Sequence, residues 1–245
     1  MTAKSSITVF VPAFNEEENL QRAVKGVLEA LIKVNPPDYE IIILNAFSSD
    51  GTGEIADNLS EEYKKIKVIH RKSWYGLGAN YMEGVRQASM SYFVLFPGDN
   101  ENSTDSLAKS LEYIGKADII VSYTLNTQVR SLHRRIVSRF FVYLLNFLFN
   151  LKLKYYNGNA VYKTDMLKKV SVRSEDFAYN AEILIKLIKS GQSFIEVGVE
   201  IKPTGKTAIF NIRNVFGVIK SIMLLFIDVT IINRGKYKKT IKQIV

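Results

Sequence analysis

Short apolar runs alternate with helically patterned segments along the first half of the chain. After the run at residues 7–11, apolar side chains recur at spacings of three and four from Leu20 to Leu31, which is typical of an amphipathic helix. Strands that alternate with helices through short connections predict an α/β fold with a doubly wound, mostly parallel sheet and helices on both faces. The runs that we interpret as buried strands are 7–11, 39–44, 66–69, 92–96 and 118–121.

The second half of the chain has a different character. Arginines at 130, 134, 135 and 139 precede a strongly apolar segment at 140–149, and a helix at 179–189 and a strand at 193–199 follow. An apolar helix at 215–232 leads into a basic tail. We therefore expect one catalytic or binding domain over residues 1–207, and an amphipathic C-terminal helix with its tail over 208–245.

Composition narrows the chemistry. The chain has no cysteine, which excludes disulfides, zinc-thiolate sites and a cysteine nucleophile. Its formal charge of +9 favours phosphate-rich partners such as nucleotides, anionic lipids or nucleic acid. Asn146, Lys220 and Asp228 interrupt the longest apolar stretches, so none reaches the ~18–20 residues of a membrane span. The N-terminus lacks the apolar core of a signal peptide.

An acidic turn follows the strand at 92–96. Pro97 and Gly98 end that strand, and Asp99 and Glu101 come next, two residues apart. In an extended segment both side chains point the same way, at the strand end where open α/β sheets bind ligands. Two hard oxygen donors suit Mg²⁺ or Mn²⁺ holding a diphosphate. The alternative is a solvated acidic turn or a helix N-cap.

A basic stripe and a basic tail point to anionic partners. On a helix, Arg130, Arg134 and Ser138 fall at successive i+4 steps beside a broad apolar face, an arrangement that suits a lipid phosphate. The alternative is an ordinary amphipathic helix with solvated arginines. The apolar 215–232 helix with its polybasic end is typical of an interfacial membrane anchor. Its alternatives are docking on the sheet or an oligomer contact.

Five motifs in order resemble the family 2 glycosyltransferases, and within them the polyprenyl-phosphate sugar transferases related to dolichol-phosphate mannose synthase. The resemblance covers nearly the whole chain. Its opening nucleotide-binding signature resembles Val11–Glu17, and the end of its acidic loop resembles Ser48–Thr52. The remaining motifs are similar to Pro97–Asp99, to the acceptor-phosphate segment Arg130–Ser138, and to the diphosphate-closing loop Lys202–Lys206.

The resemblance implies an A-type glycosyltransferase fold that inverts the anomeric centre of a UDP- or GDP-linked sugar. It implies a polyprenyl (dolichyl or undecaprenyl) phosphate acceptor held by a segment at about 126–160, with no nucleic acid. It further implies a cytoplasmic protein attached peripherally to the anionic inner face of a membrane. By carry-over, Pro12, Ala13, Glu16 and Asn45 would line the nucleoside pocket, Asp99 and Glu101 would hold Mg²⁺ or Mn²⁺, Lys206 would meet the diphosphate, and Arg130, Arg134 and Ser138 would grip the acceptor phosphate.

The chain departs from the family pattern at two places. Asn45-Ala46-Phe47 replaces the usual acidic pair and glycine, so that Ala46 offers no side-chain hydrogen bond and Phe47 adds bulk. Pro97 replaces the first aspartate of the Asp-x-Asp motif, whereas Asp99 matches the second, which chiefly holds the metal in the family.

Three functions therefore stay open. The first is transfer of a sugar to a lipid phosphate. The second is transfer to a saccharide or other hydroxyl; this chemistry needs a general base, for which Asp176 is the candidate, with Glu182 further along. The third is a degenerate, non-catalytic binding subunit, which Ala46 and Phe47 would explain. The sequence leaves the sugar, the nucleotide, the lipid length and the oligomeric state undetermined.

Overall fold

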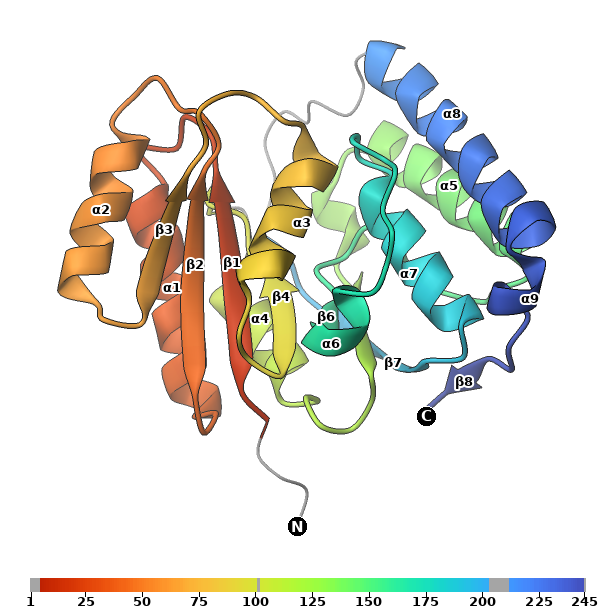
Figure 1. Cartoon of the computed structure of the whole chain (residues 1–245), viewed down its shortest axis with the longest axis horizontal. Coiled ribbons are helices and arrows are strands. Elements are labelled where there is room, and N and C mark those ends of the chain that lie inside the picture. The colour runs from red at the N-terminus through yellow and green to blue at the C-terminus, as the bar shows by residue number, and fades with distance from the viewer. Residues whose placement is uncertain (1–4, 101, 203–211, 245) are drawn as a thin grey trace.

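The computed structural model describes residues 5–100, 102–202 and 212–244 of the chain. All the strands expected from the apolar runs are present, with ends that shift by a few residues, and a helix follows each of the first four (Figure 1). The first half runs β1 Ile7–Ala13, α1 Leu20–Val34, β2 Tyr39–Asn45, α2 Thr52–Glu62, β3 Ile66–His70, α3 Leu77–Gln87, β4 Tyr92–Leu95, α4 Thr104–Leu111 and β5 Ile119–Thr124.

The second half adds long helices at one end of the sheet (Figure 1). The apolar helix expected at 215–232 is present as a helix and a π-helical turn. A two-residue strand at the C-terminus is too short to leave a periodic pattern in the sequence. The elements are η1 Thr127–Val129, α5 Leu132–Phe149, β6 Val161–Lys163, α6 Thr164–Leu167, α7 Tyr179–Lys189, β7 Ser193–Val199, α8 Ile212–Ile227, η3 Asp228–Ile232, α9 Arg234–Tyr237 and β8 Lys242–Gln243.

The sheet has eight strands in the order β3-β2-β1-β4-β6-β5-β7-β8. All neighbouring pairs are parallel except those of β6, which runs antiparallel to both β4 and β5. The chain moves outward from β1 to β2 and β3, then returns to place β4 on the other side of β1. The direction of winding therefore reverses between β1 and β4, and ligands bind at the carboxyl ends of strands at such a point. The prediction of a mostly parallel, doubly wound sheet is confirmed.

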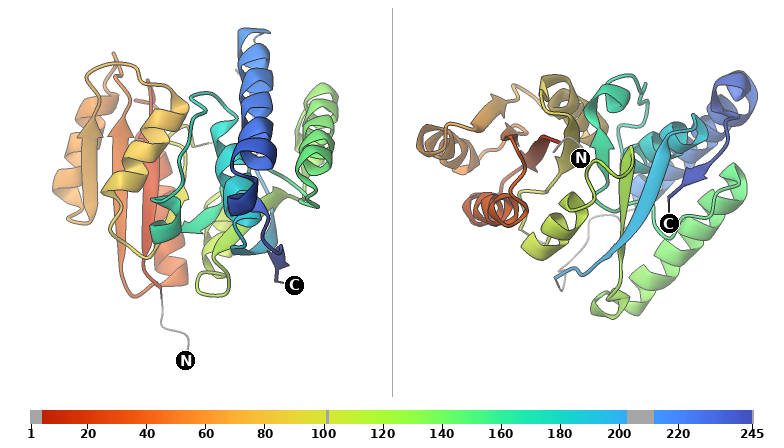
Figure 2. Two further views of the ribbon diagram at one scale, coloured as in Figure 1. Left: turned by 45° about the vertical axis from the view of Figure 1, so that its right-hand side comes forward. Right: turned by 90° about the horizontal axis from the view of Figure 1, so that it is seen from below.

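Helices cover both faces of the sheet (Figures 1 and 2). On one face α1, α2 and α4 pack against alternate strand residues such as Val9, Ile41 and Val94. On the other face α3, α5, α7 and α8 pack around a core that includes Phe10 and Phe93, whose rings stack at 5.7 Å. Since successive strand residues point to opposite faces, the central strands β1, β2 and β4 supply both cores, which is why they are almost entirely apolar.

The C-terminal helices pack against the main core. Ile222 and Leu225 of α8 are buried in it, and Lys186 of α7 forms ion pairs with Glu182 at 2.7 Å and with Asp228 at 3.0 Å. Burial lowers the pKa of Lys186, but its bonds to the two carboxylates outweigh burial and leave the pKa raised. A buried charge network that is satisfied on both sides fixes α8 and η3 against α7. The division at residue 207 falls within 203–211, outside the described residues, and stays a prediction.

None of the helices in the described residues is long and apolar enough to cross a membrane.

A buried glutamate joins the three strands at the N-terminal side of the sheet. Glu40 of β2 accepts hydrogen bonds from the Thr8 hydroxyl at 2.7 Å, from Lys67 Nζ at 2.7 Å and from the Ser89 backbone N–H at 2.6 Å. Burial raises the pKa of Glu40, but these bonds outweigh burial and hold the pKa below its ordinary value. Its ionised form therefore stabilises the pairing of β1, β2 and β3.

We expect Glu40→Ala to lower the free energy of unfolding by about 2–3 kcal/mol, because the buried Thr8 hydroxyl and the partly buried Ser89 N–H lose their charged acceptor. Urea denaturation measures this loss.

The contribution of Glu40 to the free energy of unfolding should depend on pH. Since the pKa of Glu40 is lowered on folding, this contribution is present above the unfolded pKa of about 4.3 and is lost as the pH falls through the folded pKa. The stability gap between wild type and Glu40→Gln should therefore narrow below about pH 4. Asp105→Ala, which breaks an exposed ion pair with Lys33, is the control and should have little effect. An unchanged gap at low pH would contradict the assignment.

Candidate functional site

The loops after β1 and β4 meet at the reversal point of the sheet. The Gly98 N–H donates to the Pro12 carbonyl at 3.0 Å, and a Cβ added to Gly98 would lie 3.1 Å from Ala13 Cβ. Only a residue without a side chain fits this approach undisturbed. It places the turn that carries Asp99 beside the end of β1, so that predicted site residues Pro12, Ala13 and Asp99 lie together.

The loop after β1 is also fastened to the loop after β2. The Ala46 N–H donates to the Ala13 carbonyl at 2.9 Å, and the Asn15 N–H donates to the Ser48 hydroxyl at 3.0 Å. The Glu16 N–H donates to the Thr52 hydroxyl at 2.7 Å, which puts the predicted nucleoside-site residue Glu16 at the start of α2. Three loops from neighbouring parallel strands therefore form one wall.

Two carboxylates, those of Asp50 and Glu17, accept hydrogen bonds that stabilise these loops. Asp50 accepts from the Thr52 N–H at 3.0 Å and from the Glu17 N–H at 3.3 Å. Burial raises the pKa of Asp50, but these bonds, with that of the Thr52 hydroxyl, outweigh burial and lower the pKa. Glu17 in turn accepts from the Gly51 N–H at 2.7 Å. The carboxylates of Glu17 and Asp50 thus hold the loops after β1 and β2 together.

Asn45 lies at the carboxyl end of β2 and is buried. Its Oδ1 accepts from the Ser48 N–H at 3.1 Å, and its Nδ2 donates to His70 Nδ1 at 3.2 Å. With Nδ1 as acceptor, the His70 Nε2–H donates to Asp57 at 3.0 Å. Asn45 therefore orders the loops that surround the predicted nucleoside pocket, and a direct contact with a nucleoside stays a prediction.

Asp99 is half-buried in the turn after β4. The next residue, Asn100, has a φ of +55° and accepts from Lys202 Nζ through its carbonyl at 3.2 Å and its side chain at 3.1 Å. This contact brings the first residue of the predicted diphosphate-closing loop to the acidic turn. Predicted site residues Glu101 and Lys206 lie outside the described residues.

Asp99 can contribute to a metal site but cannot form one alone. Among the described residues no group of three or more His, Asp or Glu side chains could hold a metal ion. A single carboxylate fits Mg²⁺ or Mn²⁺ when the phosphates of a bound nucleotide supply further oxygen ligands. The residues present are therefore compatible with a metal that arrives with a diphosphate.

A strongly cationic cavity of about 370 Å³ lies between α5, the end of β5 and the segment at 154–155. Predicted residues Arg130 and Ser138 line it, but Arg134 is not among its lining residues. The face of α5 that lines the cavity repeats at 135, 138, 139, 142 and 146, whereas the predicted stripe of Arg130, Arg134 and Ser138 follows another phase of the helix. The cavity is lined by Arg130, Arg135, Arg139, Lys154, Ser138, Tyr123, Tyr143, Tyr155, Thr124, Thr127, Val142 and Asn146.

The charges in this cavity are suited to an anion. No carboxylate is among its lining residues. Arg130 donates to the Tyr155 hydroxyl at 3.0 Å and lies 5.5 Å from the centre of that ring. The Nε atoms of Arg130 and Arg135 are buried and make no hydrogen bond in the structure. Buried donors are almost always paired, so these two indicate that a ligand or water completes the site.

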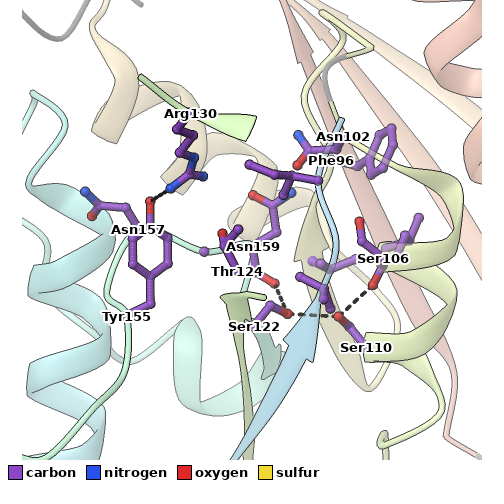
Figure 3. A pocket seen from close by; sticks show the side chains of 15 residues that line it. Phe96, Asn102, Ser106, Ser110, Ser122, Thr124, Arg130, Tyr155, Asn157 and Asn159 are labelled. Atoms are coloured by element: carbon purple, nitrogen blue, oxygen red, sulfur yellow. Dashed lines mark hydrogen bonds between the residues drawn. The ribbon is translucent and has the colours of Figure 1, made fainter. Parts of the chain in front are cut away.

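A second cavity, of about 60 Å³, lies next to this anion site (Figure 3). It is lined by Phe96 and Asn102, on either side of Asp99 in the chain, and it shares Arg130 and Tyr155 with the cationic cavity. Hydroxyl groups line one side of this cavity (Figure 3). The hydroxyl oxygens of Ser110 and Ser122 lie 2.8 Å apart, and they also bond the backbone carbonyls of Ser106 and Asn159, respectively. The reversal point and the anion site are therefore neighbours.

Asp176 and Glu182, the candidate general bases, are both engaged in structural contacts. Asp176 accepts from the Ala178 N–H at 2.8 Å and from the Ser221 hydroxyl at 2.9 Å, which ties α7 to α8. Glu182 is buried, accepts from the Ser174 N–H at 2.9 Å and pairs with Lys186.

The chain is similar in sequence to known sugar transferases. The chain is 27% identical over 204 residues to polyprenol monophosphomannose synthase of Mycolicibacterium smegmatis, covering 78% of this chain and 75% of that protein. It is 21% identical over 204 residues to undecaprenyl-phosphate mannosyltransferase of Micrococcus luteus, covering 79% and 82%.

Solved structures share the fold. Glucosyl-3-phosphoglycerate synthase from Mycobacterium tuberculosis, solved with Mn²⁺, uridine-diphosphate-glucose and phosphoglyceric acid, superposes with a TM-score of 0.67 over 91% of this chain and 79% of that chain, at 15% identity. The A-type glycosyltransferase fold is thereby confirmed. The family model "Glycosyl transferase family 2" matches residues 8–171, about two thirds of the chain, and this protein belongs to that family of glycosyltransferases.

Proposed function

We propose that this protein transfers a sugar from a nucleotide-diphosphate sugar to a polyprenyl phosphate at a membrane surface, with inversion at the anomeric carbon. The observation that carries the proposal is the cationic cavity, which places Arg130, Arg135, Arg139 and Lys154 around one space with no carboxylate in its lining. The relatives named above act on polyprenyl and undecaprenyl phosphates, which supports this class of acceptor.

The chemistry needs positioning more than proton transfer. A phosphate monoester is already anionic near neutral pH, so one of its oxygens can attack the anomeric carbon without a general base while the bond to the donor diphosphate breaks. Arg130 and Arg135, whose Nε atoms are buried without a partner, would orient the acceptor phosphate by charge-assisted bonds. The electron pair of the broken bond leaves with the nucleoside diphosphate.

The leaving diphosphate must be stabilised at the acidic turn. Asp99, with Glu101 by resemblance, would hold Mg²⁺ or Mn²⁺, which when bound supplies positive charge against the departing diphosphate. Lys202 already lies at this turn through its bonds to Asn100, and Lys206 by resemblance would add a second cation. The small hydroxyl-lined cavity between this turn and Arg130 would contact the sugar or the acceptor next to the reacting atoms.

The outer face of α5 favours a lipid acceptor over a small soluble one. While its inner face lines the cationic cavity, its outer face exposes Leu132, Ile136, Phe140 and Phe147. The adjacent end of the molecule carries α8 and η3, which expose further apolar residues, and the exposed basic tail (Figures 1 and 2). Such a surface would rest on anionic lipid, with the phosphate-binding cavity on the same helix. We place the protein peripherally on the cytoplasmic face of a membrane.

Removing one arginine of the cationic cavity should weaken binding of the acceptor specifically. We expect Arg135→Ala to raise KM for a polyprenyl phosphate by about 10- to 100-fold, because a charge-assisted bond contributes about 1.5–3 kcal/mol. Arg22→Ala, which removes an exposed arginine on α1, is the charge-matched control and should leave KM unchanged. Asp99→Ala should instead abolish transfer to every acceptor.

The same assay separates the alternatives. Transfer of radiolabelled sugar is measured with a polyprenyl phosphate, the corresponding polyprenol and 3-phosphoglycerate as acceptors. Transfer to the polyprenol that is lost in Asp176→Ala and unaffected by Arg135→Ala would establish a hydroxyl acceptor instead. If no donor binds and no acceptor reacts, the protein is a non-catalytic binding subunit.

The membrane surface is tested by vesicle flotation. Phe140→Ser with Phe147→Ser should lower binding to anionic vesicles about ten-fold or more, since each ring contributes up to about 1.5–3 kcal/mol when it leaves water. Ile32→Ser is the control, because Ile32 is 78% exposed on α1, far from α5 in the fold. Binding should also fall in high salt as the basic tail is screened. Equal flotation of the double variant and the control would remove α5 from the membrane surface.

A further inference from the structure

Large aromatic side chains gather at the carboxyl ends of β1, β2 and β3. Phe14, Phe47, Trp74 and Tyr75 are each about half exposed, between 45% and 55%. They follow directly on the three strands or precede α3, so they stand at the edge of the sheet where ligands bind. Exposed aromatic groups that cluster in this way mark a binding surface more often than scattered single ones do.

Hydrogen bonds between two loops bring two of these residues to the same part of the sheet edge. Ala46 is bonded to Ala13 and the Ser48 side chain is bonded to Asn15, so Phe47 lies across from Phe14 in the paired loops. The φ of Phe47 is +68°, an unusual conformation for a bulky residue. Strain of this kind is retained where the surroundings enforce it, and it is concentrated at ligand sites.

A third ring completes the cluster. Trp74 contacts Phe14 edge to face, with ring centres 5.0 Å apart and planes at 66°. Arg71 lies over the Tyr75 ring at 4.6 Å and bonds Asn80, which holds the loop that carries Trp74. The Phe14, Phe47 and Trp74 side chains thus come from three loops that are each tied to the rest of the site.

The polar side chains at the ends of β2 and β3 already have hydrogen-bond partners. Asn45 and His70 bond one another, and Ala46 between Asn45 and Phe47 is buried and apolar. A ligand here would therefore be recognised more by stacking on the rings than by hydrogen bonds to those groups. Stacking tolerates any flat aromatic ligand but is strongest for the largest one.

We propose that Phe14, Phe47 and Trp74 form a stacking site that selects a purine over a pyrimidine base in the donor nucleotide. The inference rests on the proposed function, because it takes the donor to lie along the wall from this cluster to Asp99. A purine presents two fused rings to the cluster and a pyrimidine presents one. The rings of Phe47 and Trp74 are specificity determinants in this proposal, whereas the metal and diphosphate contacts at Asp99 are common to all donors.

Trp74 makes the test direct, since it is the only tryptophan in the chain. The full-length protein is titrated with GDP, ADP, UDP and CDP in the presence of Mn²⁺, and Trp74 emission and thermal stability are followed in parallel. We expect the purine diphosphates to quench Trp74 and to bind about ten-fold more tightly than the pyrimidine diphosphates, in line with about 1.4 kcal/mol per ten-fold.

Substitutions at Phe47 separate the effect of ring stacking from that of side-chain size. Phe47→Leu keeps an apolar side chain without a ring and should reduce the purine preference to about the level of Phe47→Ala, while UDP affinity changes little. Ile32→Ala, on an exposed face of α1, should leave all four titrations unchanged. Because thermal stability does not depend on tryptophan emission, Trp74→Phe can be titrated as well and should retain the preference.

The outcomes against the proposal are distinct. If nucleotides raise thermal stability but UDP binds as tightly as GDP and Phe47→Leu has no effect, the stacking site is wrong and the proposed transferase function stands. If no nucleotide changes either readout, both are wrong. If Trp74 emission responds to anionic vesicles and not to nucleotides, the cluster contacts lipid and the proposal is overturned.

Discussion

The site depends on how closely the turn after β4 approaches the end of β1. Gly98 packs so closely against Pro12 and Ala13 that a Cβ there would displace them by a few tenths of an ångström, and this contact sets Asp99 at the reversal point of the sheet. The same strand end holds the loop after β2 through the Ala13–Ala46 hydrogen bond. One small residue therefore positions the acidic turn against the two loops that form the wall of the candidate site, and a parallel sheet supplies the rigid base for all three.

From this base the site extends toward α5 without a break. The hydroxyl-lined cavity runs from the residues around Asp99 to Arg130, and Arg130 also lines the cationic cavity. A donor diphosphate near Asp99 and an acceptor anion near Arg130 would thus share one boundary, which is what an in-line displacement between them needs. No carboxylate lines the cavity that holds the three arginines, so their charges are not neutralised by the acidic groups of the loops after β2 and β4. The cationic cavity and the acidic turn would therefore bind different ligands.

The sequence allowed the fold to be predicted better than the site. Buried strands leave continuous apolar runs, so the parallel sheet could be read directly, whereas β8 is too short to leave a pattern. Arg130 and Ser138 were predicted among the residues that line the cationic cavity. Arg135 and Arg139 were not, because the phase of α5 is set by packing of Leu145 and Phe149 and not by the arginine spacing. Lys154 was not predicted either, because it comes from the segment after α5 that the fold brings to the cavity. The bond of the Asn45 side chain to His70 could not be predicted, because His70 is distant in sequence and only the pairing of β2 with β3 brings it near.

The C-terminal helix α8 packs on the core with one face and exposes apolar residues on another, so docking on the sheet and contact with a membrane are compatible. Its apolar residues are too many for one face: Ile222 and Leu225 enter the core, while Ile219 and Met223 stay exposed. The charged anchor of Lys186 and Asp228 fixes this orientation, so the exposed face is held out and cannot turn inward. On its inner side α8 binds Asp176 through Ser221, and the neighbouring Glu175 carbonyl accepts the Leu77 N–H at the start of α3, directly after the Trp74 loop. The surface that would meet lipid and the loops that would hold the nucleotide are therefore joined by a short chain of rigid contacts.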